Sequence, residues 1–586
     1  MKKQLLFIFI AIAVIFSGSC TRKPAPLMNL KYDQNIGLSY EKAIDCYSRL
    51  DDYYPEAKLM QMGMTDAGLP LHLFMISGDG NFDPEKIRKE GKSIILINNG
   101  IHPGEPEGID ASVNFAADIL SDKDGMKQYL KNCVIAIIPV YNIGGLRDHS
   151  HYFRIDQNGP EEKGVRRNPR FLDLNRDFVK QESREARSFA SIFRFLDPDV
   201  FLDTHTTDGS DHQFTLTLIG TQPDNMTEEM RDFFSGKMLP SLYARMKEES
   251  KTEMVPYVEY SDHGPVNEIL GYEESPMLST GYASLFNTYA FMTETLIYKP
   301  FAERVEATYQ FILQLTRYTS ENCKEMLALR ADANKQLLTA KEMTIDWSTD
   351  TTRWENLLFR GYEWDDTIAP ISGIKTGYYN HNRPYEDSIK YFCYFKPEVT
   401  ITLPEAYIVP FAWEQVIEKM QHNGVNMHQL RSDTTIRVET YYIDSYKPVG
   451  RATQGHYVND EIKIHALTQD IKYHAGDYVI PLNQRTNKYI VRMLEPQSSC
   501  GFFAWNYFDS FLEGQDWYGV WGFESHLKSL LDTDKVLRAA FEKHKAEDPE
   551  FAADHIAQLQ WLYQNTPAYV LEKRRNLYPV GRLLRR

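Results

Sequence analysis

Two histidines and one glutamate in this chain have the types and the spacing that a catalytic zinc ion requires. His102 and Glu105 stand in the segment His102-Pro103-Gly104-Glu105, and His205 follows about 100 positions later in Asp203-Thr204-His205. A zinc ion that performs chemistry takes three protein ligands of the histidine and carboxylate type and keeps its fourth position for water. A His-x-x-Glu pair alone is a weak signal, and a lone Asp-x-His segment is more often structural. Together the three residues predict one Zn²⁺ site per chain.

A polar segment between these ligands carries side chains that such a site needs around it. The segment Asp173-Leu174-Asn175-Arg176-Asp177 offers a carboxylate for the second ring nitrogen of a ligating histidine. It also offers an amide and a guanidinium that can hold an anion through charge-assisted hydrogen bonds. The alternative is that the segment is only a turn that caps a helix.

The elements expected around these residues alternate between strands and helices. This alternation, from residue 30 to about residue 320, is typical of an α/β fold with a mostly parallel sheet. Near-continuous apolar runs such as Ile94-Ile95-Leu96-Ile97 suit strands that are covered on both faces. We expect strands at 71–76, 94–97, 134–140, 200–203, 214–219 and 289–296, and helices at 40–50, 109–120 and 301–318.

The His-x-x-Glu pair lies in a loop between one of these strands and the next helix. The strand at 94–97 ends, Asn98-Asn99-Gly100-Ile101 turns the chain, and His102 follows. The pair is therefore expected just beyond the carboxyl end of the strand, which is where open α/β sheets place their ligands.

The second half of the chain changes character after about residue 331. A polar, threonine-rich connection is expected around 344–352, and short alternating strands such as Ile436-Arg437-Val438-Glu439 follow it. An amphipathic helix is expected at 412–422, and helical segments at about 527–565 are expected to close the chain. The predicted organisation is a catalytic domain over 30–330 and a β-rich accessory domain with C-terminal helices over 350–586.

The N-terminus has the pattern of an export signal. Met1-Lys2-Lys3 precedes an apolar run over 5–16, and Ser17-Gly18-Ser19-Cys20 follows. The pattern predicts a signal peptide over 1–19, which is too short to span a membrane. Small residues before Cys20 resemble a bacterial lipobox, although Ser17 stands where leucine is usual, and they imply acylation of Cys20 after cleavage. The alternative is ordinary secretion with Cys20 as a plain thiol.

We therefore expect an exported protein that a lipid tethers to a bacterial membrane, facing the periplasm or the cell exterior. Composition adds limits on its partners. The formal net charge is -16 and no basic block stands out, which argues against nucleic acid and anionic membrane surfaces as partners. With 42% hydrophobic residues, a chain of 586 residues can bury the cores of two domains. Nothing in the sequence indicates the oligomeric state.

The motifs, taken together, resemble the zinc carboxypeptidases of the carboxypeptidase A type. Order and approximate spacing match for His102-x-x-Glu105, Asp173-x-Asn175-Arg176, His205 and Glu294 in Thr293-Glu294-Thr295. The similarity covers about half of the chain, from near residue 40 to residue 318. It implies a mixed, mostly parallel sheet flanked by helices, with one Zn²⁺ ion held by His102, Glu105 and His205.

The resemblance also assigns roles to the residues around the metal. Asp173 would orient His102, and Glu294 would be the general base that takes a proton from zinc-bound water. Asn175 and Arg176 would grip the terminal carboxylate of the substrate. The alternative for Glu294 is an inward-facing strand carboxylate paired with a cation.

The resemblance implies two further roles, each with more than one candidate residue. Arg166 would polarise the scissile carbonyl and stabilise the oxyanion, although its neighbour Arg167 can take that role instead. Arg166 has the alternative of being one more solvated charge in a basic cluster. A tyrosine that closes over the substrate is expected between residues 263 and 282, with Tyr272 and Tyr282 as candidates.

The sequence also departs from the digestive members of that family. Gly104 lies where they carry an arginine that helps to bind extended peptides, and Leu69 replaces another arginine. Ser279-Thr280-Gly281 would build part of the side-chain pocket without an acid, so a strict preference for basic terminal residues is not supported. Glu273 and Glu274 stand nearby and keep this question open.

The function predicted from these observations is that of an exported, lipid-anchored zinc metallocarboxypeptidase. Its partner would be a peptide with a free C-terminal carboxylate. One alternative is a zinc-dependent deacylase of N-acyl amino acids, which the same metal and glutamate would serve. Another is a catalytically inert lipoprotein that binds a peptide or a glycan, and the complete set of zinc ligands with Glu294 argues against it.

Overall fold

The structure is a computed structural model that describes residues 26–258, 266–513, 520–566 and 576–585. The predicted signal peptide and Cys20 lie outside these residues, so the predicted cleavage and acylation stay predictions. Among the described helices, none combines the length and the apolar composition that crossing a bilayer requires.

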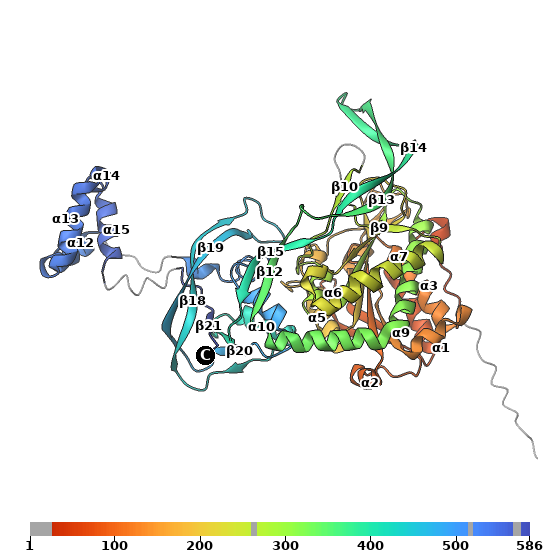
Figure 1. Cartoon of the computed structure of the whole chain (residues 1–586), viewed down its shortest axis with the longest axis horizontal. Helices are drawn as coiled ribbons and strands as arrows, with labels where there is room; N and C mark the ends of the chain where they lie inside the picture. Colours follow the sequence, from red (N-terminus) through yellow and green to blue (C-terminus); the bar gives the residue numbers. More distant parts are fainter. Residues whose placement is uncertain (1–25, 259–265, 514–519, 567–575, 586) are drawn as a thin grey trace, which may run out of the picture.

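A mixed sheet of eight strands forms the centre of the N-terminal half (Figure 1). Its strand order is β1-β2-β4-β3-β7-β11-β8-β9, and the neighbours β4, β3, β7 and β11 run parallel to one another. This confirms the expected mixed, mostly parallel sheet. The strands are β1 (Ala57–Met64), β2 (Pro70–Ile76), β3 (Ser93–Asn99), β4 (Cys133–Ile138), β7 (Val200–Thr207), β8 (Leu216–Gly220), β9 (Met254–Pro256) and β11 (Tyr289–Leu296).

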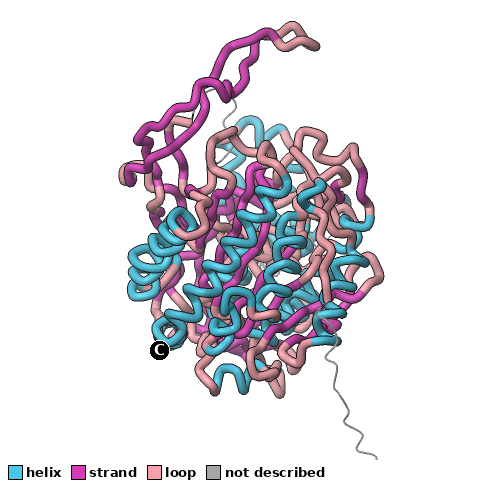
Figure 2. Tube along the Cα trace, turned by 90° about the vertical axis from the view of Figure 1, so that its right-hand side faces the viewer, coloured by secondary structure: helices cyan, strands magenta, loops and turns pink. Residues whose placement is uncertain are grey.

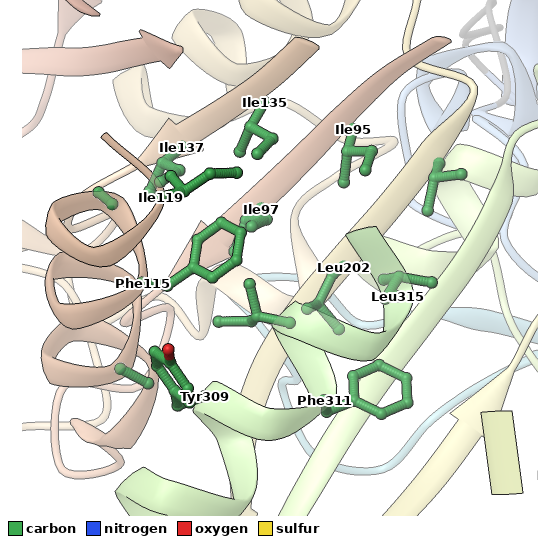
Figure 3. Close-up of a cluster of buried hydrophobic side chains, with 14 of the residues drawn as sticks. Ile95, Ile97, Phe115, Ile119, Ile135, Ile137, Leu202, Tyr309, Phe311 and Leu315 are labelled. Atoms are coloured by element: carbon green, nitrogen blue, oxygen red, sulfur yellow. The ribbon is translucent and has the colours of Figure 1, made fainter. Parts of the chain in front are cut away.

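Helices cover both faces of this sheet because its central strands are apolar on both sides. Successive side chains of a strand point to opposite faces, so Ile95 and Ile97 of β3 face one layer of helices while Ile94 and Leu96 face the other. Figure 3 shows Ile97 beside the ring of Phe115, which belongs to one helix of the first layer. The helices around the sheet are α1 (Tyr40–Tyr53), α2 (Pro84–Lys89), α3 (Glu107–Leu120), α4 (Ile143–Arg147), α5 (Arg184–Leu196), α6 (Glu228–Phe233), α7 (Leu239–Glu248), α8 (Ser279–Ser284) and α9 (Phe301–Thr339).

The C-terminal half contains a second sheet that shares a hydrophobic core with the first. Its six strands have the order β17-β20-β16-β21-β18-β19. Buried residues of this half, such as Tyr407 and Ile417, belong to the same cluster as Phe193 of α5 and Phe201 of β7. The new elements are β16 (Ala406–Val409), α10 (Glu414–His422), β17 (His428–Gln429), β18 (Thr434–Pro448), β19 (Asn459–Tyr473), β20 (Tyr478–Pro481), α11 (Asn487–Leu494) and β21 (Gly581–Leu583).

Two expectations for the junction between the halves are corrected by the structure. Helix α9 continues to Thr339, well beyond residue 318. The polar connection expected around 344–352 is wrong, because β12 (Glu342–Thr349) pairs antiparallel with β15 (Phe395–Thr402). Its threonines misled the prediction, since Thr344 contacts Thr400 across the two strands while Ile345 is buried beneath them.

A long hairpin projects from the body of the molecule (Figure 2). It consists of β13 (Glu355–Ile368) and β14 (Lys375–Phe392), and β10 (Glu268–Leu270) pairs with the end of β14. Midway along its length the hairpin contacts the segment after β7, where His381 Nε2 lies 2.6 Å from Asp211 Oδ2.

The chain does not end on helices, which corrects another expectation. Four helices pack around a small cluster of their own that includes Phe541 and Phe551. The chain then returns as β21 between β16 and β18 of the second sheet. The helices are α12 (Val520–Thr533), α13 (Lys535–Glu547), α14 (Pro549–Ala553) and α15 (His555–Gln564).

A buried arginine provides a test of how α9 is held on the sheet. Arg330 donates to Asp199 at 2.8 Å and to Asp197 at 2.5 Å, and the Asp199 side chain is only 1% exposed. Arg330→Leu removes the closer of the two cations beside the buried Asp199 and leaves only Arg88, at 3.7 Å, so we expect the free energy of unfolding to fall by about 3 kcal/mol in chemical denaturation. Arg317→Leu is the control, because its ion pairs lie at the surface and its loss should cost less than about 1 kcal/mol. Equal effects would contradict this role of Arg330.

Candidate metal centre

The three predicted ligands meet at the carboxyl edge of the central sheet. His102 and Glu105 lie in the loop between β3 and α3, and His205 lies in β7, which pairs with β3 in parallel. One ligand atom from each residue lies within 4.8 Å of the others, and all three side chains are buried. Neighbouring parallel strands end at the same edge, which is why residues 100 positions apart in sequence converge here.

The spacing and chemistry of these atoms fit a zinc ion. The Nδ1 atoms of His102 and His205 are 3.2 Å apart, and they lie 3.3 Å and 3.0 Å from Glu105 Oε2. Tetrahedral zinc with bonds of about 2.0–2.1 Å separates its ligand atoms by about 3.3 Å. Both Nε2 atoms face carboxylates, so the protons belong there and the Nδ1 lone pairs point at one another. A cation between them removes that repulsion.

A carboxylate orients each of the two histidines. Asp173 Oδ1 lies 3.0 Å from His102 Nε2, and Asp203 Oδ2 lies 2.8 Å from His205 Nε2. Asp203 itself accepts hydrogen bonds from Asn98 and Ser279. This role of Asp203 was missed in the sequence, although Asp203-x-His205 in a strand places both side chains on one face and was a usable signal.

Glu105 is held by two groups besides the histidines. The backbone N–H of Thr206 donates to its Oε2 at 3.0 Å, and Arg154 Nη1 donates to its Oε1 at 3.0 Å. Burial acts to raise the pKa of Glu105, but the charges of His102 and Arg154 hold that pKa well below its usual value. Arg154 was not found in the sequence, because nothing local connects it to Glu105.

The glycine in the His-x-x-Glu segment makes room for this arginine. A Cβ atom at Gly104 would lie 2.7 Å from Cδ of Arg154 and 2.9 Å from the carbonyl oxygen of Gly164. Both distances are shorter than a Cβ atom can keep to a non-bonded carbon or oxygen atom. Gly104 therefore lets a cation from another loop reach Glu105.

Glu294 lies beside the metal ligands because of strand register. It pairs with His205 across the parallel strands β11 and β7. Burial raises the pKa of the Glu294 carboxyl to about 8, an effect that His205 opposes and the negative charge of Glu105 reinforces. The strand register therefore places a carboxyl group beside the metal ligands, where a general base is needed.

Arg166, and not Arg167, faces this cluster. Arg166 Nε donates to Asp173 Oδ2 at 2.9 Å, and its Nη1 lies 3.2 Å from His102 Nδ1. Arg167 is exposed and donates to the carbonyl oxygen of Phe171. Of the two arginines, Arg166 is therefore the one whose charge lies beside the metal ligands.

Asn175 and Arg176 lie on the short 3₁₀ turn that follows Asp173. Asn175 is buried, and its side-chain oxygen accepts a hydrogen bond from the backbone N–H of Ser279 at 3.0 Å. That contact leaves the amide nitrogen of Asn175 as a donor. Arg176 is half-buried, and its Nη1 donates to the carbonyl oxygen of Asn175 at 2.8 Å. The segment therefore presents donors next to Asp173.

The two candidate tyrosines lie in different environments. Tyr282 is only 1% exposed, packs among Phe178, Phe189 and Phe193, and donates its hydroxyl to Asn423. Tyr282 is therefore a core residue, and its candidacy as the tyrosine that closes over the substrate is wrong. Tyr272 is half-buried, with its ring edge-on to Tyr257 at 5.6 Å.

Comparisons with a family model and with solved structures each match about half of the chain. The sequence model of a family described as Zinc carboxypeptidase matches residues 44–367. Among solved structures, a putative carboxypeptidase A from Shewanella denitrificans is 16% identical, with 49% of this chain and 69% of that chain covered and a TM-score of 0.38. A metallo-carboxypeptidase from Burkholderia cenocepacia is 16% identical, with 49% and 70% covered and a TM-score of 0.36. A metallo-carboxypeptidase from Pseudomonas aeruginosa, in complex with (2-guanidinoethylmercapto)succinic acid, is 15% identical, with 50% and 70% covered and a TM-score of 0.37. No curated protein matches the chain significantly.

The second carboxylate provides a test of the metal centre. Asp203→Asn keeps the shape of the side chain but weakens its hold on His205, so we expect zinc affinity to fall about 10- to 100-fold. Competition with a chromogenic chelator measures that affinity. Asp208→Asn is the matched control, because Asp208 is exposed and follows the same strand. Unchanged zinc affinity in Asp203→Asn would contradict the assignment.

Proposed function

This chain belongs to the zinc carboxypeptidase family, and we propose that it hydrolyses the C-terminal peptide bond of peptides. The observation that carries the proposal is the position of Glu294, which lies next to His205 on adjacent parallel strands. A carboxylate beside a three-ligand metal cluster is placed to activate water for attack on a carbonyl group. The inert alternative does not account for a complete site of this kind.

Substrate binding is assigned to the donors that follow Asp173. Arg176 presents a planar guanidinium that can make two parallel hydrogen bonds to a carboxylate, and Asn175 adds an amide donor. A free C-terminal carboxylate held by this pair places the last peptide bond of the substrate toward the metal ligands. Removal of the C-terminal residue then follows from where the substrate is gripped.

The chemical step is assigned to two residues of the chain. A bound zinc ion would lower the pKa of a water molecule at its open position and polarise a carbonyl group. Glu294 accepts the proton of the attacking water and returns it to the nitrogen of the leaving residue. Arg166 lies beside His102, where its positive charge stabilises the negative charge that develops on the carbonyl oxygen.

The cellular setting of this activity is a separate proposal that rests on the sequence. Signal cleavage before Cys20 and acylation of its thiol would anchor the enzyme to a bacterial membrane from outside the cytoplasm. Peptides released there, including stem peptides of peptidoglycan, are substrates of the right chemistry.

Glu294→Gln tests the assigned base. The amide cannot accept the proton of water, so we expect kcat to fall about 10²- to 10⁴-fold while zinc stays bound. Mass spectrometry of a mixed peptide library, with N-acyl amino acids as a second panel, measures which bonds are cleaved. Glu303→Gln is the control, because Glu303 is an exposed glutamate on α9.

Several outcomes would contradict the proposal in distinct ways. Trimming that survives unchanged in Glu294→Gln would remove the assigned base. Internal cleavage alone would remove the C-terminal specificity, and hydrolysis of N-acyl amino acids alone would make the enzyme a deacylase.

Arg176→Met tests the grip on the substrate carboxylate. A hydrogen-bonded charge contributes about 1.5–3 kcal/mol, so we expect KM for peptides with a free C-terminus to rise about 10- to 100-fold. Peptides with an amidated C-terminus should be hydrolysed slowly by both enzymes and show little difference. Arg167→Met is the control, since Arg167 is exposed on the same loop. A change that is equal for free and amidated peptides would argue against the role.

A further inference from the structure

The turn between β18 and β19 brings the C-terminal half against the segment that starts at Asp173. At its tip, Thr453 and His456 exchange two backbone hydrogen bonds of 2.7 Å and 2.9 Å. The two residues between them, Gln454 and Gly455, have φ angles of 52° and 84°. Two central residues with positive φ are typical of the tight hairpin turn that matches strand twist. The turn therefore holds the backbone of Gln454 in a defined conformation.

Gln454 is linked to the metal centre through one hydrogen bond with Asp173, the residue that contacts the ligand His102. Its side-chain Oε1 accepts from the backbone N–H of Asp173 at 2.8 Å. The carboxylate of Asp173 accepts hydrogen bonds from Asn175 N–H and from Arg166 Nε, and it contacts His102 Nε2. Asp173 is thus a single residue that joins the C-terminal half to a metal ligand and to the arginine beside it.

The same turn also contacts Glu182, at the other end of the segment that starts at Asp173. His456 Nε2 lies 2.6 Å from Glu182 Oε1, and the Tyr507 hydroxyl donates to the same oxygen at 2.9 Å. Between these ends, the Lys180 ammonium lies 4.9 Å from the centre of the Trp505 ring. The C-terminal half therefore holds the segment from Asp173 to Glu182 at both ends.

We propose that Gln454 is a positioning residue of the metal centre, which makes the C-terminal half part of the active site. The proposal rests on the proposed function for its catalytic consequence and on the metal centre for its structural one. Asp173 is buried, so its N–H loses its hydrogen-bond partner when the acceptor oxygen of Gln454 is removed. The backbone at Asp173 is then free to shift, and its carboxylate shifts with respect to His102.

The expected loss of zinc affinity depends on how many residues separate Gln454 from the metal. Loss of a group that directly contacts a ligating histidine lowers metal affinity about 10- to 100-fold. Gln454 acts one residue further out, through Asp173. A smaller loss, of about three- to tenfold, is therefore expected for the removal of its acceptor oxygen.

Two substitutions at this position separate the hydrogen bond from the packing of the side chain. Gln454→Met keeps the length of the side chain and removes the acceptor. Gln454→Glu keeps an acceptor oxygen at the same distance, and neither residue is branched at Cβ. Thr453→Ala is the matched control, because Thr453 is exposed on the same turn and its backbone hydrogen bonds do not need its side chain.

The experiment uses the full chain and zinc alone as its probe, measured by chelator competition. We expect zinc affinity in Gln454→Met to fall about three- to tenfold and kcat to fall by a similar factor, with KM within about twofold and little change in Tm. Gln454→Glu should bind zinc at least as tightly as the unmodified chain, and Thr453→Ala should match it.

Three results would overturn the proposal. Gln454→Met that binds zinc as tightly as the unmodified chain would show that the hydrogen bond positions nothing. Equal losses in Gln454→Met and Gln454→Glu, or a loss in Thr453→Ala, would assign the effect to general disturbance of the turn. Because zinc is titrated without a peptide, a chain that binds zinc as expected but trims no peptide would reject the proposed function and leave this inference standing.

Discussion

The parallel pairing of β3, β7 and β11 is the constraint on which the rest of the site depends. In this register Asn98 lies opposite Asp203, and Glu294 lies opposite His205. A shift by one residue would turn every side chain of a strand to the other face, so the same ladder of hydrogen bonds sets both the core and the chemistry. The apolar residues of these strands form the core, and the polar residues at their carboxyl ends lie close together.

Buried charges hold the loops beneath this edge. Arg304, fully buried on α9, donates to Glu107 at 2.6 Å and to the carbonyl oxygen of Gly159 at 2.6 Å. Glu107 also accepts from the hydroxyl of Thr206, and the N–H of that threonine binds Glu105. A buried ion pair of this kind adds little net stability but is costly to break, so it restricts where the loops can lie. Thr206 therefore links the metal ligand Glu105 to the buried pair of Glu107 and Arg304.

The C-terminal half contributes to the site as well as to the core. Its apolar residues pack on α5, and Lys419 and Asn423 reach the carbonyl oxygen of Lys180 and the side chain of Gln181. These contacts lie on the segment from Asp173 to Glu182, which contains Asn175 and Arg176, the residues predicted to bind the substrate carboxylate. Without this half, the three metal ligands would all remain in the chain, but the N–H of Asp173 would lose its hydrogen bond to Gln454.

The sequence by itself determined the features that are local along the chain. Alternating or continuous apolar runs predicted the central strands within a few residues, and the His-x-x-Glu spacing with Asp173 and Glu294 predicted which side chains the structure brings together. Tertiary structure alone decided the rest. It placed Tyr282 in the core, made a strand of the polar stretch at 342–349, and brought Arg154 to Glu105 and Gln454 to Asp173. The physical reason is that such contacts join residues far apart in sequence, and only the packing of whole elements decides which of many similar polar side chains meet.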